Sequence, residues 1–161
     1  MKKLKIYLDT STVSYLEAQN YPDRMKETHK LWKEIKAEKF EVFLSDTTLK
    51  EIGRCSQPKL KVLTDYLGEI KHTIISDSDE IDELAQMIVD MGILKEKDYD
   101  DCMHIASAVV GDCDVIVSWN FKHMVNIKTV RGVRAITILQ GYNKSIDIVA
   151  PPSVLSENEE E

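Results

Sequence analysis

Asp9 stands where an acidic side chain could take part in chemistry. It directly follows the short apolar run 4–8 and precedes three hydroxyl residues, Thr10, Ser11 and Thr12. A strand that ends at an acid and turns into a helix places that carboxylate at its carboxyl end, where open α/β sheets bind ligands. Any of the three hydroxyl residues could cap the following helix, so we expect the Asp9 carboxylate to be free for another task.

Two further acids, Glu51 and Asp101, have comparable settings. Glu51 comes shortly after the apolar run 42–44, and Asp101 precedes the β-branched run 115–118. Three carboxylates that converge on one sheet edge, without a cluster of His or Cys, favour a hard cation such as Mg²⁺ or Mn²⁺. The predicted metal ligands are therefore Asp9, Glu51 and Asp101.

Structural roles compete with this interpretation. Glu51 could be a surface glutamate paired with Arg54, and capping or the helix dipole explains Asp98 and Asp100 at the start of a helix. Capping and the helix dipole explain Asp101 poorly, because Asp101 lies on the same face of that helix as the apolar residues that should pack against the sheet. His104 and Trp119 are more often packing residues than ligands or base-stacking groups, and Trp32 fits a core or an interface.

The elements that must position these acids alternate between strand-like and helix-like patterns, which is typical of an α/β fold with a parallel sheet. Short helical stretches are also expected around residues 46–52 and 60–67. The predicted strands are 4–8, 41–44, 73–75, 115–118 and 135–139. The predicted longer helices are 11–18, 22–37, 81–91 and 98–110.

Length and composition favour one ordinary globular domain. The chain has 161 residues, 43% apolar and 30% charged, and lacks a run long enough to span a membrane. Its three cysteines form no C-x-x-C pair, and its N-terminus does not fit a signal peptide, so we expect a cytoplasmic protein. We assign residues 1–150 to the domain and residues 151–161 to an acidic, disordered tail.

Charge is unevenly distributed along the chain. The net charge of −7 argues against a protein that coats nucleic acid by bulk electrostatics. Residues 115–146 nevertheless contain five lysines and arginines and no acid. A locally basic region beside clustered acids suits a phosphodiester substrate near metal ions, although a solvated basic face explains the composition equally well.

Four segments in this order resemble the PIN-domain family, the nuclease fold of VapC-type toxins. They are Leu8-Asp9-Thr10-Ser11, Leu49-Lys50-Glu51-Ile52, the helix Asp101-Cys102-Met103-His104-Ile105-Ala106-Ser107-Ala108, and the strand and loop Val115–His123. The third is similar to the family's D-x-x-H-[IL]-A-x-A helix. The resemblance extends from residue 4 to about residue 140.

The resemblance implies a fold and a site. The fold is a PIN-like three-layer α/β/α sandwich around a mainly parallel sheet of about five strands. The site holds magnesium or manganese for ribonuclease activity, and Asp9, Glu51 and Asp101 take the ligand positions. Many members of the family have a fourth acid near the position that Asn120 occupies in this chain. The amide oxygen of Asn120 could ligate the metal, and Asp98 is an additional candidate ligand.

The chemistry implied is hydrolysis of RNA. Bound metal ions would polarise the scissile phosphate and activate a water, and the resemblance implies products with a 3′-hydroxyl and a 5′-phosphate. Ser11 and Ser118 are predicted to orient the carboxylates, and Lys122, His123 and Arg131 to contact RNA phosphates.

Other functions fit the sequence less well. A haloacid-dehalogenase-type phosphatase needs a second Asp where Ser11 stands, and the acids of a receiver domain and the glycine motifs of nucleotide-binding loops are missing. An inactive PIN scaffold that binds RNA or protein is the remaining alternative, motivated by Asn120. A VapC-like toxin implies an antitoxin partner and a homodimer. We expect the helices around Trp32 and residues 60–67 to supply the surfaces for these contacts.

Overall fold

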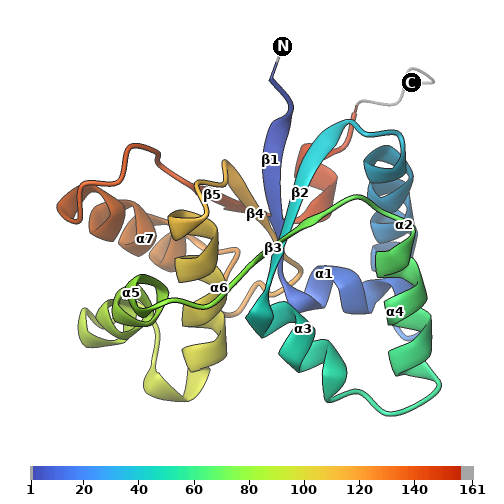
Figure 1. Ribbon diagram of the computed structural model, residues 1–161, viewed down its shortest axis with the longest axis horizontal. Coiled ribbons are helices and arrows are strands. Elements are labelled where there is room, and N and C mark those ends of the chain that lie inside the picture. Colours follow the sequence, from blue (N-terminus) through green and yellow to red (C-terminus); the bar gives the residue numbers. More distant parts are fainter. Residues whose placement is uncertain (1, 157–161) are drawn as a thin grey trace.

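A five-stranded parallel sheet in the order β3-β2-β1-β4-β5 forms the centre of the molecule (Figure 1), in a computed structural model that describes residues 2–156. The strands are β1 (Leu4–Leu8), β2 (Phe40–Ser45), β3 (Thr73–Ile75), β4 (Val115–Val117) and β5 (Asp147–Val149). The α-helices are α1 (Thr10–Ser14), α2 (Pro22–Lys36), α3 (Asp46–Gly53), α4 (Lys59–Gly68), α5 (Asp79–Asp90), α6 (Tyr99–Val110) and α7 (Ile127–Leu139). Short 3₁₀ helices are η1 (Tyr15–Glu17), η2 (Glu96–Asp98) and η3 (Pro151–Val154).

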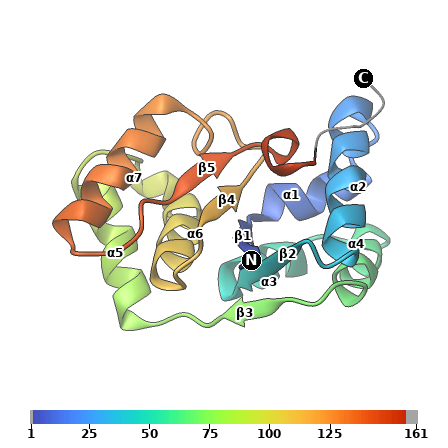
Figure 2. The same cartoon turned by 90° about the horizontal axis from the view of Figure 1, so that it is seen from above.

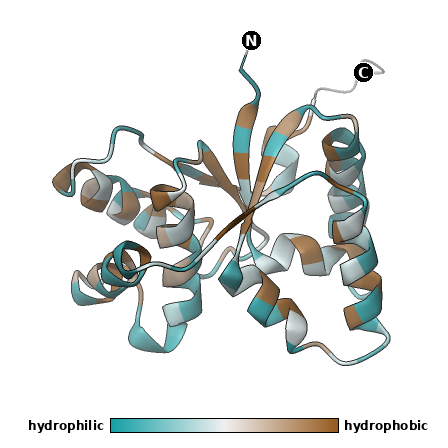
Figure 3. Cartoon of the chain, in the orientation of Figure 1, coloured by the Kyte–Doolittle hydropathy of each residue, from teal (hydrophilic) through white to brown (hydrophobic). Residues whose placement is uncertain are grey.

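Helices cover both faces of the sheet, which confirms the predicted three-layer α/β/α sandwich. Figure 2 shows α5, α6 and α7 on one side, and α1, α2 and α4 on the other. Successive residues of β1 serve different cores: Tyr7 packs with the first group of helices, and Ile6 and Leu8 pack with the second. Because both faces are buried, the strands are predominantly hydrophobic, as the brown colour in Figure 3 shows.

The strand order creates a switch point at the centre of the sheet. From β1 the chain proceeds to β2 and β3 on one side, and β4 and β5 then lie on the other side of β1. Leu8 pairs with Val117 in the parallel register, so Asp9 and Ser118 are the next residues of two adjacent strands. Open α/β sheets bind ligands at such a point, outside the carboxyl ends of the strands.

The predicted last strand, 135–139, is wrong. These residues form the end of α7, and the last strand is β5, at Asp147–Val149. The β-branched run Ile-Thr-Ile suggested a strand, but tertiary packing decided the structure. The Asn126 side chain accepts a hydrogen bond from the backbone N–H of Thr129 and caps the helix, and buried Val133 and Ile136 recur at helical spacing.

The side chains predicted to bind a partner protein are buried in the fold. Trp32 is 1% exposed, and Leu63 and Leu67 are buried in the core between the sheet and helices α1, α2 and α4. These side chains stabilise the fold and are not available to another protein.

The C-terminal segment is ordered where the structure describes it. Pro151 is buried, Val154 and Leu155 pack against the core, and the Ser156 hydroxyl donates a hydrogen bond to Glu34. The domain boundary at residue 150 stays a prediction, and the rest of the acidic tail, 157–161, lies outside the described residues. None of the helices in residues 2–156 has the length and apolar character needed to cross a membrane.

Two substitutions can distinguish the helix α7 from the strand that the sequence predicts at residues 135–139. Ile136→Ala should cost about 2–5 kcal/mol of unfolding free energy, because Ile136 is fully buried. Ile138→Ala should change it by less than about 0.5 kcal/mol, because Ile138 is 75% exposed. In a strand these residues would share one face, so similar losses in urea denaturation would contradict the helix.

Candidate metal centre

Asp9 is buried at the carboxyl end of β1 and caps α1. Only 3% of the residue is exposed. Its Oδ1 accepts hydrogen bonds from the Ser11 hydroxyl at 2.7 Å, the Thr12 backbone N–H at 3.1 Å and the Thr12 hydroxyl at 3.2 Å. Its Oδ2 accepts one from the Ser118 hydroxyl at 2.5 Å. The expectation that another residue would cap this helix is therefore wrong.

Capping leaves one oxygen of Asp9 with spare capacity. The Ser11 hydroxyl and the Thr12 backbone N–H occupy Oδ1, while the single proton of the Thr12 hydroxyl is shared with the Val117 carbonyl, which lies closer at 2.7 Å. Oδ2 accepts only from Ser118 among the described residues. The predicted orienting residues, Ser11 and Ser118, both contact this carboxylate. They also fix the chain after β4, because the backbone N–H of Trp119 donates to Ser11 and that of Asn120 donates to Ser118.

Glu51 belongs to a second hydrogen-bond network, centred on His104. Its Oε1 accepts from the Thr10 hydroxyl at 2.7 Å and from Nε2 of His104 at 2.5 Å. The predicted alternative, a pair with Arg54, is not formed, since Arg54 instead binds Asp100. His104 is buried, and its Nδ1 lies 2.6 Å from the hydroxyl of Tyr7.

Electrostatics favours a charged pair between His104 and Glu51. Burial by itself lowers the pKa of His104, but the hydrogen bond to Glu51 and the charges of Asp9, Glu51 and Asp101 outweigh it, so the pKa is raised. Burial alone would raise the pKa of Glu51, yet the contacts with His104 and Thr10 hold it below its ordinary value. Glu51 is thus a fixed anion at the edge of the site.

Tyr7 anchors this network inside the sheet. Its hydroxyl lies 2.7 Å from the Ser45 hydroxyl at the end of β2, in addition to its contact with His104. Burial raises the pKa of Tyr7, so the side chain stays a neutral phenol. The network therefore links β1, β2, α3 and α6.

Asp101 occupies the first turn of α6 and is half-buried. Burial raises its pKa, the charge of Asp9 adds to that effect, and His104 and His123 oppose it. The charge of Asp9 thus acts on the carboxyl group of Asp101. A cation at this position would favour the ionised form of Asp101.

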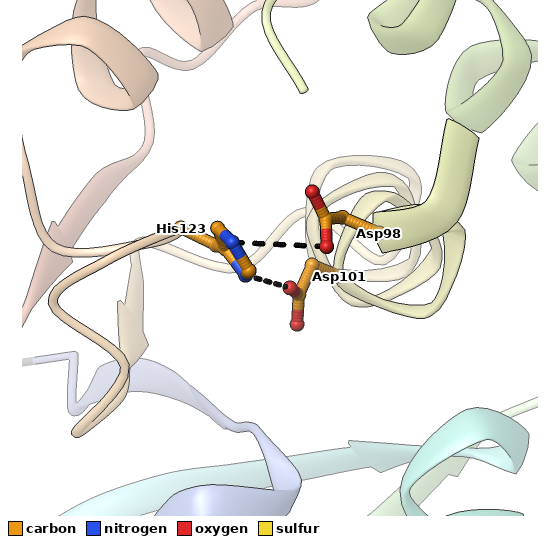
Figure 4. Close-up of side chains that lie close together, drawn as sticks. All are labelled: Asp98, Asp101 and His123. Carbon is orange, nitrogen blue, oxygen red and sulfur yellow. Dashed lines mark hydrogen bonds and ion pairs between the residues drawn. The ribbon is translucent and has the colours of Figure 1, made fainter. Parts of the chain in front are cut away.

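Asp98, Asp101 and His123 form the tightest group of candidate ligands (Figure 4). In the described part of the chain, this is the one set of three such side chains whose ligand atoms all lie within 4.8 Å of one another. Nδ1 of His123 lies 3.0 Å from Oδ2 of Asp101, and its Nε2 lies 3.7 Å from Oδ1 of Asp98. Two carboxylates and an imidazole are a donor set that fits a divalent metal ion.

The predicted ligand set is therefore placed only in part. Asp9, Glu51 and Asp101 all lie at the carboxyl edge of the sheet, but they are not gathered as tightly as the group around His123. His123 faces two acids, and its predicted contact with RNA stays a prediction. Asn120 uses its amide oxygen to accept a hydrogen bond from the backbone N–H of His123, so its role as a ligand stays a prediction.

Lys122 and Arg131, the other predicted RNA contacts, are exposed. Their role in binding RNA is untested and stays a prediction.

An aromatic cluster beside the site was missed by sequence reasoning. The guanidinium of Arg24 lies 5.2–5.9 Å from the ring centres of four aromatic residues. Two of these rings, Tyr21 and Phe121, are about half exposed, whereas Trp119 is buried and donates a hydrogen bond to Thr28. No spacing along the chain joins Arg24 to Phe121, so the cluster had no signal in the sequence. The remaining ring is Tyr15.

Comparison with known proteins agrees with this geometry. The family model for the PIN domain matches residues 5–122, which is most of the chain. The chain belongs to the PIN-domain family. PIN domains are generally nucleases that use a divalent metal, so the family and the acidic edge of the sheet point to the same chemistry.

A solved structure shares the PIN fold. It is the crystal structure of VapBC2 from Rickettsia felis bound to a DNA fragment from the promoter, with a TM-score of 0.56 and 14% identity. The match covers 91% of this chain and 98% of the other. At this identity the likeness concerns the fold. A comparison with curated proteins found no match.

The network behind the PIN-domain site can be tested by removing one hydroxyl. Tyr7→Phe should destabilise the fold by about 1–3 kcal/mol, because it leaves buried groups of His104 and Ser45 without their partner. Urea denaturation measures the change. The matched control is Tyr66→Phe, whose hydroxyl has no partner among the described residues and whose loss should cost less than about 0.5 kcal/mol. Equal effects of the two substitutions would contradict the network.

Proposed function

We propose that this PIN domain is a metal-dependent endoribonuclease. The observation that carries the proposal is the gathering of acids from β1, α3 and α6 at the switch point of the parallel sheet. Asp9 and Asp101 interact electrostatically there, and Glu51 is held beside them by His104. Buried like charges are costly without a cation, so this arrangement favours metal binding.

The residues of the site have distinct tasks in the proposed reaction. A divalent cation held by Asp9, Glu51 and Asp101 would polarise the scissile phosphate and lower the pKa of the attacking water. Ser118 and Ser11 hold the Asp9 carboxylate in place, and His104 does the same for Glu51. Hydrolysis then leaves a 3′-hydroxyl and a 5′-phosphate.

Two features beside the acids support a single-stranded RNA substrate. Lys122 is exposed in the loop between the aromatic Phe121 and the acid-facing His123, where it could contact a phosphate. The exposed rings of Tyr21 and Phe121, next to the Arg24 guanidinium, offer faces on which unpaired bases stack.

We further propose that the nuclease acts as a VapC-like toxin in the cytoplasm. The structural likeness to VapBC2 motivates this role and its partner, a small antitoxin protein. A homodimer is the second proposed contact. The exposed apolar side chains at the end of α7, Ile138 and Leu139, are better candidates for such contacts than the buried residues expected from the sequence.

Cleavage is tested by a substitution and a matched control on the same turn of helix. Asp101→Asn should reduce metal-dependent RNA cleavage by about 100-fold or more, a loss equivalent to about 2.7 kcal/mol of barrier. Asp100→Asn should leave cleavage almost unchanged, because this side chain faces Arg54 on the surface. Product ends and rates are followed on several single-stranded RNAs with Mg²⁺ or Mn²⁺.

Chelation by EDTA should abolish the wild-type reaction. Cleavage that persists in EDTA, or in Asp101→Asn, would contradict the proposed mechanism. A wild-type chain that binds metal but cleaves none of the RNAs would favour the alternative of an inactive PIN scaffold, which the neutral Asn120 already motivates.

The toxin role is tested in growing cells. Expression of the wild-type chain should arrest growth, and the Asp101→Asn variant should not, because arrest depends on cleavage. The product of the neighbouring gene should relieve arrest and shift the chain to a larger complex in size-exclusion chromatography. A monomer peak at micromolar concentration, unchanged by that gene product, would argue against both partner proposals.

A further inference from the structure

His123 is held in a rigid position in the loop after β4. Its backbone N–H donates to the amide oxygen of Asn120 at 2.9 Å, and its carbonyl accepts from the Thr129 hydroxyl at 2.8 Å. The amide of Asn126 donates to the carbonyls of Phe121 and Lys122. The loop is thus fixed on both sides of His123, as a ligand position requires.

The imidazole of His123 spans the two acids at the start of α6. Figure 4 shows Asp98 and Asp101 on the same side of its ring, with one ring nitrogen directed toward each carboxylate. The ring is 24% exposed, so solvent and ions can reach it.

The charges around this group are unbalanced. In residues 2–156, Asp98 and Asp101 pair with no lysine or arginine, and His123 is the only basic side chain in direct contact with them. The charge of His104 acts on Asp101 from farther away. The adjacent Asp100, which faces away, has its own cation in Arg54. The two acids that face His123 therefore lack the lysine or arginine partner that Asp100 has.

Asn120 connects this group to the departure from the PIN pattern. It stands near the position of a fourth acid, and its side chain holds the backbone of His123. The residue that stands near the expected fourth acid therefore helps to hold an imidazole beside Asp98 and Asp101.

We propose that His123, with Asp98 and Asp101, ligates a divalent cation through its imidazole, and that the site prefers a first-row transition ion such as Mn²⁺ to Mg²⁺. This rests on the proposed cation site at Asp101. Magnesium binds almost only oxygen and keeps much of its water, whereas transition ions accept an imidazole nitrogen among carboxylates. The nitrogen ligand is thus the source of the preference.

Pulsed electron paramagnetic resonance of Mn²⁺ bound to the full chain tests the ligand directly, without RNA. The wild-type complex should show coupling between Mn²⁺ and an imidazole nitrogen. His123→Gln should remove this coupling and weaken Mn²⁺ binding by about tenfold or more, with a smaller effect on Mg²⁺. His72→Gln, in an exposed residue before β3, is the matched control and should retain both properties.

A second variant, His123→Asp, separates a lost ligand from a damaged fold. It should bind Mn²⁺ without nitrogen coupling and gain affinity for Mg²⁺ relative to Mn²⁺, because an oxygen replaces the nitrogen. Bound Mn²⁺ without nitrogen coupling in the wild type, or coupling that persists in His123→Gln, would overturn this inference alone. A wild-type chain that binds no Mn²⁺ would overturn both this inference and the metal-dependent nuclease.

Discussion

Burial of the Asp9 carboxylate is the constraint on which the rest of the structure depends. A parallel sheet with helices on both faces leaves the end of its central strand almost no solvent, and a carboxylate there needs hydrogen bonds from the protein itself. Hydroxyls from the start of α1 and the end of β4 supply these bonds. The bond between Asp9 and Ser118 also joins the ends of β1 and β4. The same hydrogen bonds therefore stabilise the fold and position the proposed site.

Helix α6 carries most of the remaining site because its first turns cross from solvent into the core. Asp98 and Asp101 lie where the helix emerges, and His104 lies one turn deeper, against Tyr7. Each of these side chains meets a partner from another element: the loop after β4, helix α3 or strand β1. The polar groups therefore fix the position of α6 on the sheet, which apolar packing alone would specify less strictly.

Much of the fold could be predicted because apolar periodicity and caps agree along most of the chain. The strand 73–75 and the position of Asp9 at the end of a strand were predictable for this reason. The end of α7 was misread because Ile136 and Ile138 look alike in sequence, and only packing tells which one is buried. The positions of His104 and His123 depend on contacts between residues far apart in the chain, which periodicity does not encode.

The contacts that assemble the site join distant parts of the chain. Ser118 and Asp9 are 109 positions apart, and Tyr7 and His104 are 97 apart. During synthesis on the ribosome, the segment with Asp9 and Glu51 emerges long before α6 and the loop after β4. A nascent chain shorter than 123 residues lacks part of the site, so the translation machinery that makes this proposed nuclease meets the complete site only near the end of its synthesis.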